Sequence, residues 1–118
     1  MEIRRYGIGH RRADGPPGTR GVRGGPIHGD ARGVLSELAF ARRAVLEPQL
    51  TPNTAWLLVV EGGGWVQVGE ERALLAAGEA VLFPAGVPHG AWADLSEMRA
   101  ILVELTGPDD THLRGILE

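Results

Sequence analysis

Hydrophobic residues along the chain fall into short runs separated by turn-forming residues. Most of these runs are bounded by Gly, Pro, Asn or Asp, which favour turns. No convincing helical pattern of ten or more residues occurs between residues 26 and 107. The pattern therefore predicts an all-β sandwich or barrel. The runs, each of strand length, cover residues 34–40, 44–46, 56–60, 65–68, 73–75, 80–83, 89–92 and 99–105.

The spacing of the runs also predicts a hairpin and two terminal segments. Residues 65–68 and 72–75 flank a short turn in which Gly69 can adopt the positive φ that tight turns require. Residues 1–26 contain few side chains suited to burial, which indicates an extended N-terminal arm. We expect the barrel over residues 27–107 and a C-terminal tail over 108–118, with a short helical turn around 111–117.

Length and composition agree with one globular domain. The chain has 118 residues, of which 43% are hydrophobic and 23% charged, as in ordinary folded domains. No apolar stretch is long enough to cross a bilayer, and the N-terminus lacks the apolar core of a secretory signal. We therefore expect a cytoplasmic protein without a membrane partner.

Charge is distributed unevenly along the chain. The formal net charge is -3, yet residues 1–23 contain six arginines against Glu2 and Asp14. Because no aromatic stacking platform or recognition helix accompanies these arginines, a nucleic-acid partner is not expected. An arm of this kind is better suited to covering a sheet edge of a second subunit, which predicts a homodimer.

The absence of cysteine limits the kinds of metal site and catalytic site that the chain can form. It excludes disulfides, thiolate zinc sites and cysteine nucleophiles, and leaves four histidines and the carboxylates as strong metal ligands. Any metal site in this chain must consist of His, Asp and Glu.

One motif identifies a family. Gly78, Pro84, Gly86 and His89 are spaced as GxxxxxPxGxxH, and this pattern resembles the second conserved motif of the cupin superfamily. Residues 55–62 resemble the strand that ends the first cupin motif. The resemblance covers about residues 34–105. It implies a double-stranded β-helix, the cupin jelly-roll barrel, with the ring of His89 directed inside and a binding pocket at one mouth.

The first cupin motif is degenerate in this sequence. In the family it supplies two histidines and a glutamate that bind a metal, followed by a glycine that corresponds here to Gly62. By either of the spacings found in the family, three of the four usual metal ligands are absent. Counting back from Gly62 gives Gln49, Thr51 and Ala55 at the three ligand positions, or Pro48, Leu50 and Ala55 with the longer spacing.

Several residues are candidates for the site. His89, Gln49, Thr51 and Trp56 are predicted to bind a ligand inside the barrel.

His89 is also a weak candidate for a metal ligand. An amide oxygen and a hydroxyl are poor ligands for a transition metal, so no tightly bound cofactor is expected, while a divalent metal stays an alternative. A metal bound by His89 would need Gln49, His28 or Glu104 as a further ligand. His10 and His112 are expected to be solvated, and Asn53 to form a turn.

Four functions follow from these features. The leading one is a single-domain cupin that binds a small molecule, whose identity the sequence does not reveal. The second is a metal-dependent enzyme of the dioxygenase, isomerase or decarboxylase type with a non-standard ligand set. The third is a metal-free enzyme with His89 as general base, although the only tyrosine, Tyr6, lies in the arm. The fourth is a structural or regulatory module.

Overall fold

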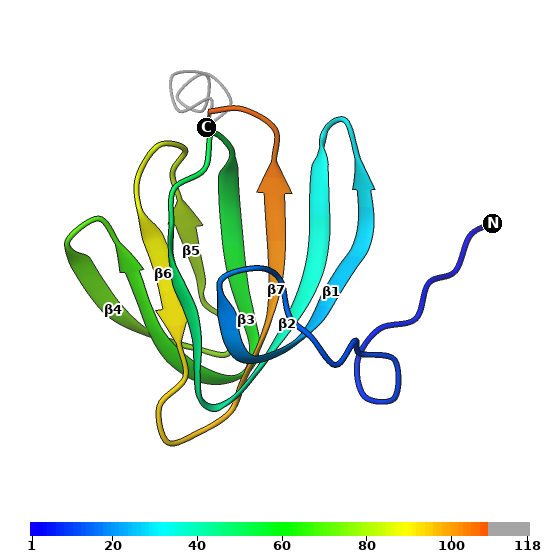
Figure 1. Ribbon diagram of the computed structural model, residues 1–118, viewed down its shortest axis with the longest axis horizontal. Helices are drawn as coiled ribbons and strands as arrows, with labels where there is room; N and C mark the ends of the chain where they lie inside the picture. Colours follow the sequence, from blue (N-terminus) through cyan, green and yellow to red (C-terminus); the bar gives the residue numbers. More distant parts are fainter. Residues whose placement is uncertain (109–118) are drawn as a thin grey trace.

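The computed structural model describes residues 1–108 and is built of seven β-strands (Figure 1). Within these residues there is no helix that could cross a membrane. The strands are β1 (Thr19–Asp30), β2 (Gly33–Gln49), β3 (Thr54–Val68), β4 (Glu71–Ala76), β5 (Ala80–Phe83), β6 (His89–Trp92) and β7 (Met98–Leu105).

Two long strands close the sheet into a barrel. β2 pairs with both β6 and β7, and β3 also pairs with both, so these four strands form a complete circuit. β1 adds to β2, while β4 and β5 add to β3, and every pairing is antiparallel. The double-stranded β-helix expected from the sequence is confirmed.

The long strands arise because pairs of predicted runs join into one strand. Residues 34–40 and 44–46 both belong to β2, and residues 56–60 and 65–68 both belong to β3. β2 bends where Arg43 adopts a φ of 62°. β3 bends near Gly62, where a Cβ atom would lie 2.0 Å from the carbonyl oxygen of Glu97. Only glycine fits at that position.

The expected hairpin and motif geometry are also present. Val68 pairs with Glu71, so Gly69 and Glu70 form the turn, and Gly69 has a φ of 59°. The cupin motif passes through β5, a turn and the start of β6. His89 is buried at that start.

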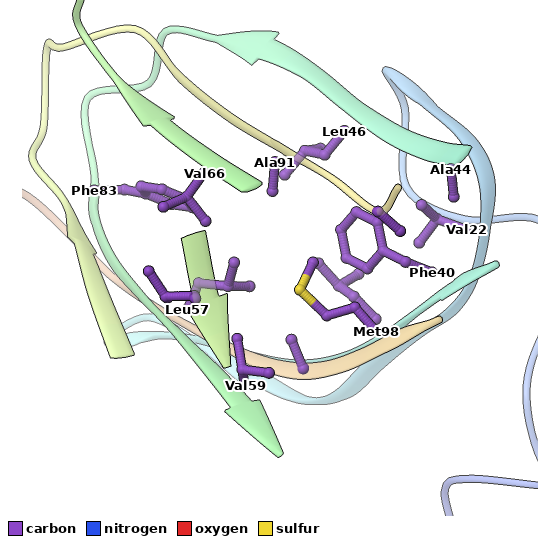
Figure 2. Packing of buried hydrophobic residues seen from close by; sticks show 14 of the residues in the cluster. Val22, Phe40, Ala44, Leu46, Leu57, Val59, Val66, Phe83, Ala91 and Met98 are labelled. Atoms are coloured by element: carbon purple, nitrogen blue, oxygen red, sulfur yellow. The ribbon is translucent and has the colours of Figure 1, made fainter. Parts of the chain in front are cut away.

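The hydrophobic core fills the interior by strand alternation. Along β3, Leu57 is fully buried, whereas the next residue, Leu58, is 37% exposed. Figure 2 shows Phe40 and Met98 packed together inside the barrel, with Val59 and Leu57 directed into the same interior. Adjacent strand residues therefore separate into an inner and an outer set.

The N-terminal arm is more structured than the sequence suggested. β1 begins at Thr19, so the predicted boundary at residue 26 falls inside a strand, and Val22 joins the core. Within this single chain the arm packs on its own barrel, and the homodimer stays a prediction. The helical turn expected around residues 111–117 lies outside the described residues.

A buried carboxylate fixes the arm to the outside of the barrel. Glu37 of β2 is 1% exposed. It accepts hydrogen bonds from the backbone N–H of Gly7, from Arg11 and from Nε of Arg99, at 2.8 to 3.3 Å. The guanidinium of Arg99 also lies 5.8 Å from the ring centre of Tyr6. We call Gly7, Arg11, Glu37 and Arg99 the Glu37 cluster.

The electrostatics of the Glu37 cluster favour the ionised carboxylate. Burial by itself would raise the pKa of Glu37, but the hydrogen bonds and charges of Arg11 and Arg99 outweigh burial and lower its pKa. A carboxyl group with a lowered pKa in the folded state stabilises the fold at pH values above its pKa in the unfolded chain. That stabilisation is lost as the pH falls through the lower, folded-state pKa.

Strand alternation predicts different effects for two neighbouring leucines. Leu57→Ala should lower the free energy of unfolding by about 2 to 5 kcal/mol, because it leaves a cavity in the core. Leu58→Ala, on the outer face, should change it by less than about 1 kcal/mol. Urea denaturation of both variants measures the difference, and equal losses would contradict the assigned inner and outer faces.

Glu37→Gln should destabilise the protein by about 3 kcal/mol at pH 7, because it removes the buried charge that Arg11 and Arg99, both partly buried, compensate. The difference from the wild type should shrink as the pH falls through the lowered pKa of Glu37, because the wild-type side chain then becomes protonated as well. Urea denaturation between pH 7 and pH 3 measures it. The control is Glu61→Gln, which removes an exposed partner of Arg99 and should cost less than about 1 kcal/mol. A Glu37→Gln variant as stable as the wild type at pH 7 would show that the cluster does not stabilise the fold.

Candidate functional site

A cavity of about 390 Å³ opens at one end of the barrel. Its lining includes residues near the ends of β2, β5 and β7 and the starts of β3 and β6. This end is opposite the β6–β7 connection, which contacts the bends of β2 and β3. The barrel is therefore filled by the core at one end and hollow at the other.

Most of the barrel wall around the cavity is apolar. Leu38, Leu46, Phe83 and Leu102 contribute aliphatic or aromatic surface. The methyl group of Ala55 lines the cavity at the position where the family usually has a glutamate. A cavity of this size and character is typical of a small-molecule site.

His89 is the most distinctive polar group of the cavity. Its ring stacks on Phe83, with ring centres 4.4 Å apart and an angle of 14° between the planes. Nδ1 lies 3.2 Å from the carbonyl oxygen of Val87, which can only accept a hydrogen bond. In the neutral ring Nδ1 therefore carries the proton and Nε2 the lone pair. Nε2 has no hydrogen-bond partner among residues 1–108, so it is available to a ligand.

Gln49 and Glu104 line the same cavity. Gln49 pairs with His89 across the β2–β6 ladder, so the two side chains leave the sheet on one face. Nε2 of Gln49 donates to the carbonyl oxygen of Pro17 at 2.9 Å. Glu104 accepts a hydrogen bond from Nδ2 of Asn53, also at 2.9 Å. Each side chain keeps one oxygen that accepts no hydrogen bond from the described part of the chain.

Part of the cavity wall comes from the N-terminal arm, which sequence reasoning did not assign to the site. Arg12, Asp14, Gly15, Pro16 and Pro17 all line the cavity. The density of Gly and Pro in this segment signalled irregular structure, but nothing local in the sequence indicated where the segment lies. We call residues 12–17 the strap.

Two predicted ligand-binding residues do not line the cavity. The hydroxyl of Thr51 donates to the carbonyl oxygen of Asn53 at 3.0 Å, within the turn that joins β2 to β3. Trp56 lies between the inward residues Ala55 and Leu57 of β3, so its side chain projects to the outer face. Asn53 is in the turn, as expected.

His28 lies on the outer surface, away from the cavity. Nε2 of His28 is 3.1 Å from Asp30, which also accepts hydrogen bonds from Arg32. The hydrogen bond from the Arg32 side chain, followed by that from His28, strongly lowers the pKa of Asp30. His28 is therefore engaged with this turn and does not line the cavity with His89. His10 is exposed, and His112 lies outside the described residues.

The donors around the cavity do not fit a tightly bound transition metal. Within the part of the chain that the structure describes, His89 is the only imidazole that lines the cavity, and Ala55 offers a methyl group. Among residues 1–108, no three His, Asp or Glu side chains form a group that could hold a metal ion. Tight sites normally use three or more such donors.

Comparisons with known proteins agree with this architecture. A family model described as a cupin domain matches residues 38–105. The structure of TT1209 from Thermus thermophilus is 28% identical with a TM-score of 0.68, covering 74% of this chain and 83% of that one. No curated protein matches the chain.

Two further solved structures are similar at lower identity and show the fold alone. The polyketide cyclase RemF from Streptomyces resistomycificus has 20% identity and a TM-score of 0.73, over 89% of this chain and 78% of that one. A predicted oxalate decarboxylase from Thermotoga maritima has 10% identity and a TM-score of 0.70, over 75% and 84%. With a closed double-stranded β-helix, the second conserved motif ending in a buried His89, and a family model matched over more than half of its length, the chain belongs to the cupin family.

Proposed function

We propose that this cupin binds a small organic molecule inside its barrel. The observation that carries the proposal is the cavity of about 390 Å³, with apolar walls and a few polar groups from different strands. His89 offers Nε2, and Gln49 and Glu104 each offer an oxygen. Ligand sites commonly combine a mainly apolar surface with a few polar groups that set orientation.

The apolar wall determines the kind of molecule that suits this site. Phe83 and the leucines provide a surface that favours an aromatic or aliphatic body. The ring of His89 is held between the Phe83 stack and the Val87 carbonyl. A ligand hydroxyl or N–H that donates to Nε2 would be fixed without movement of the ring, which reduces the entropy cost of binding.

Metal-dependent catalysis is the alternative function that the sequence predicted. Divalent metals are frequent in cupins, and a predicted decarboxylase is among the structural neighbours. In this chain the positions that correspond to the first motif offer Gln49, Thr51 and Ala55. These side chains do not favour tight binding, and a metal held here would need other ligands.

Metal-free acid–base chemistry is supported by one feature, the lone pair on Nε2 of His89. A neutral imidazole with its other nitrogen hydrogen-bonded is arranged as a general base is. Tyr6, the only tyrosine, lies against Arg99 and does not line the cavity, so it does not supply the acid partner. Binding therefore remains the function that the geometry supports best.

Binding inside the barrel predicts that 2-naphthamide, a neutral aromatic probe, perturbs the cavity. Its addition should shift the backbone amide signals of Ser36, Gln49, His89 and Glu104 in ¹H–¹⁵N NMR spectra. Ala55→Phe should weaken binding at least tenfold, because the ring occupies the cavity. Leu58→Phe, on the outer face of the same strand, is the control and should leave binding unchanged. Absence of any shift at cavity residues would contradict the proposed function.

The donor set predicts little bound metal. Inductively coupled plasma mass spectrometry on untagged protein should find well below one equivalent of any first-row transition metal, because a single imidazole does not retain such an ion through purification. A full equivalent that disappears in His89→Ala would contradict this expectation and favour the metal-dependent enzyme.

A further inference from the structure

The strap is fixed at both ends, so its place beside the cavity is defined. At its start, the backbone carbonyl oxygen of Arg12 accepts from the N–H of Gly24 at 3.3 Å. At its end, the carbonyl oxygen of Pro17 accepts from Gln49, and the next carbonyl, of Gly18, accepts from the N–H of Glu47 at 2.8 Å. The strap thus joins β1 on one side and β2 on the other.

The Glu37 cluster holds the chain immediately before the strap. Arg11 donates from Nε and Nη2 to the two carboxylate oxygens of Glu37, at 3.1 and 3.3 Å. Glu37 faces outward, whereas its neighbours Ser36 and Leu38 line the cavity. One strand of the barrel therefore carries both the anchor of the arm and part of the cavity wall.

Arg12 differs from the arginines that flank it in sequence. Arg11 pairs with Glu37, and Arg20 pairs with Glu47. Arg12 lines the cavity, and its side chain has no hydrogen bond or ion pair with any of residues 1–108. Its Cδ lies 3.5 Å from the place where a Cβ on Gly25 would be. The aliphatic part of the side chain therefore lies beside β1, and the guanidinium has no partner among residues 1–108.

The other charges at the cavity limit what Arg12 can recognise. In the described part of the chain, Asp14 of the strap and Glu104 of β7 are the carboxylates that line the cavity. Two carboxylates and one guanidinium around the same cavity disfavour a ligand with two negative charges. One anionic group beside Arg12 is favourable, because a guanidinium binds a carboxylate through two parallel N–H donors.

We propose that the strap is part of the ligand site and that Arg12 selects a small aromatic or aliphatic molecule carrying a single carboxylate. This inference rests on the proposed function, since it names the class of ligand for the same cavity. The apolar body occupies the barrel interior and the carboxylate lies at the rim beside Arg12. His89 and Gln49 contact the body of the ligand deeper in the barrel.

A matched pair of probes tests the charge preference. 2-Naphthoate and 2-naphthamide share the ring system and differ in charge, and their affinities can be measured by fluorescence titration. The wild type should bind 2-naphthoate about fivefold more tightly than 2-naphthamide, the gain expected from a partly exposed ion pair. In Arg12→Gln the preference should vanish, with the affinity for 2-naphthamide unchanged.

Arg42→Gln is the control, because it removes the same charge from an exposed position of β2 that does not line the cavity. It should retain the preference, and thermal unfolding should show that both variants are folded. If 2-naphthamide binds the cavity but 2-naphthoate binds no more tightly, or if Arg42→Gln loses the preference equally, the role of Arg12 is wrong and the proposed function stands. If neither probe binds, the proposed function fails.

Discussion

The barrel depends on the bends in its two longest strands and on the connection between β6 and β7 that contacts both bends. At the bend of β2, the N–H of Arg43 donates to the carbonyl oxygen of Asp94 at 3.0 Å. At the bend of β3, Gly62 leaves space for the carbonyl of Glu97. Because each long strand pairs with β6 and with β7, straight strands could not close the circuit. These contacts hold one end of the barrel shut and leave the other end for a cavity.

The cavity is a consequence of small side chains placed at the open end. Phe40 and Met98 fill the closed half of the interior, whereas Ala55 and Ser36 occupy positions near the open end. The metal-binding glutamate of related barrels would stand at Ala55, so the loss of that ligand also enlarges the apolar wall. His89 is retained, and its ring contacts Phe83 and the Val87 carbonyl. These positions underlie the proposal that the cavity takes an organic ligand.

The arm connects the outer surface of the barrel to its interior. Glu37 is buried on the outer side of β2 only because the arm covers it, and the arm stays in place because Glu37 binds Arg11. Burying a carboxylate is unfavourable unless several donors compensate it. Here two arginines and one backbone N–H do so. The position of the strap beside the cavity therefore depends on an ion-pair cluster whose residues do not line the cavity.

The sequence alone determined the fold and the inward histidine, because both follow from local signals. Strand-length runs, the Gly69 turn and the Gly78 to His89 motif depend on residues close to one another in the chain. The resemblance to the first cupin motif also placed Ala55 at the position of a metal ligand. It did not show that pairs of runs join into β2 and β3, since the bend at Arg43 has no local signal and is held by a carbonyl about fifty residues away.

Only the tertiary structure decided which other residues meet His89. It brought Gln49 and Glu104 to the cavity and left Thr51, Trp56 and His28 elsewhere, because strand alternation and register select the face on which each side chain lies. It also placed the strap at the cavity. The contacts responsible join Arg11 to Glu37 and Pro17 to Gln49, over separations of 26 and 32 residues. Such long-range pairings depend on the closed barrel and leave no periodic pattern in the chain.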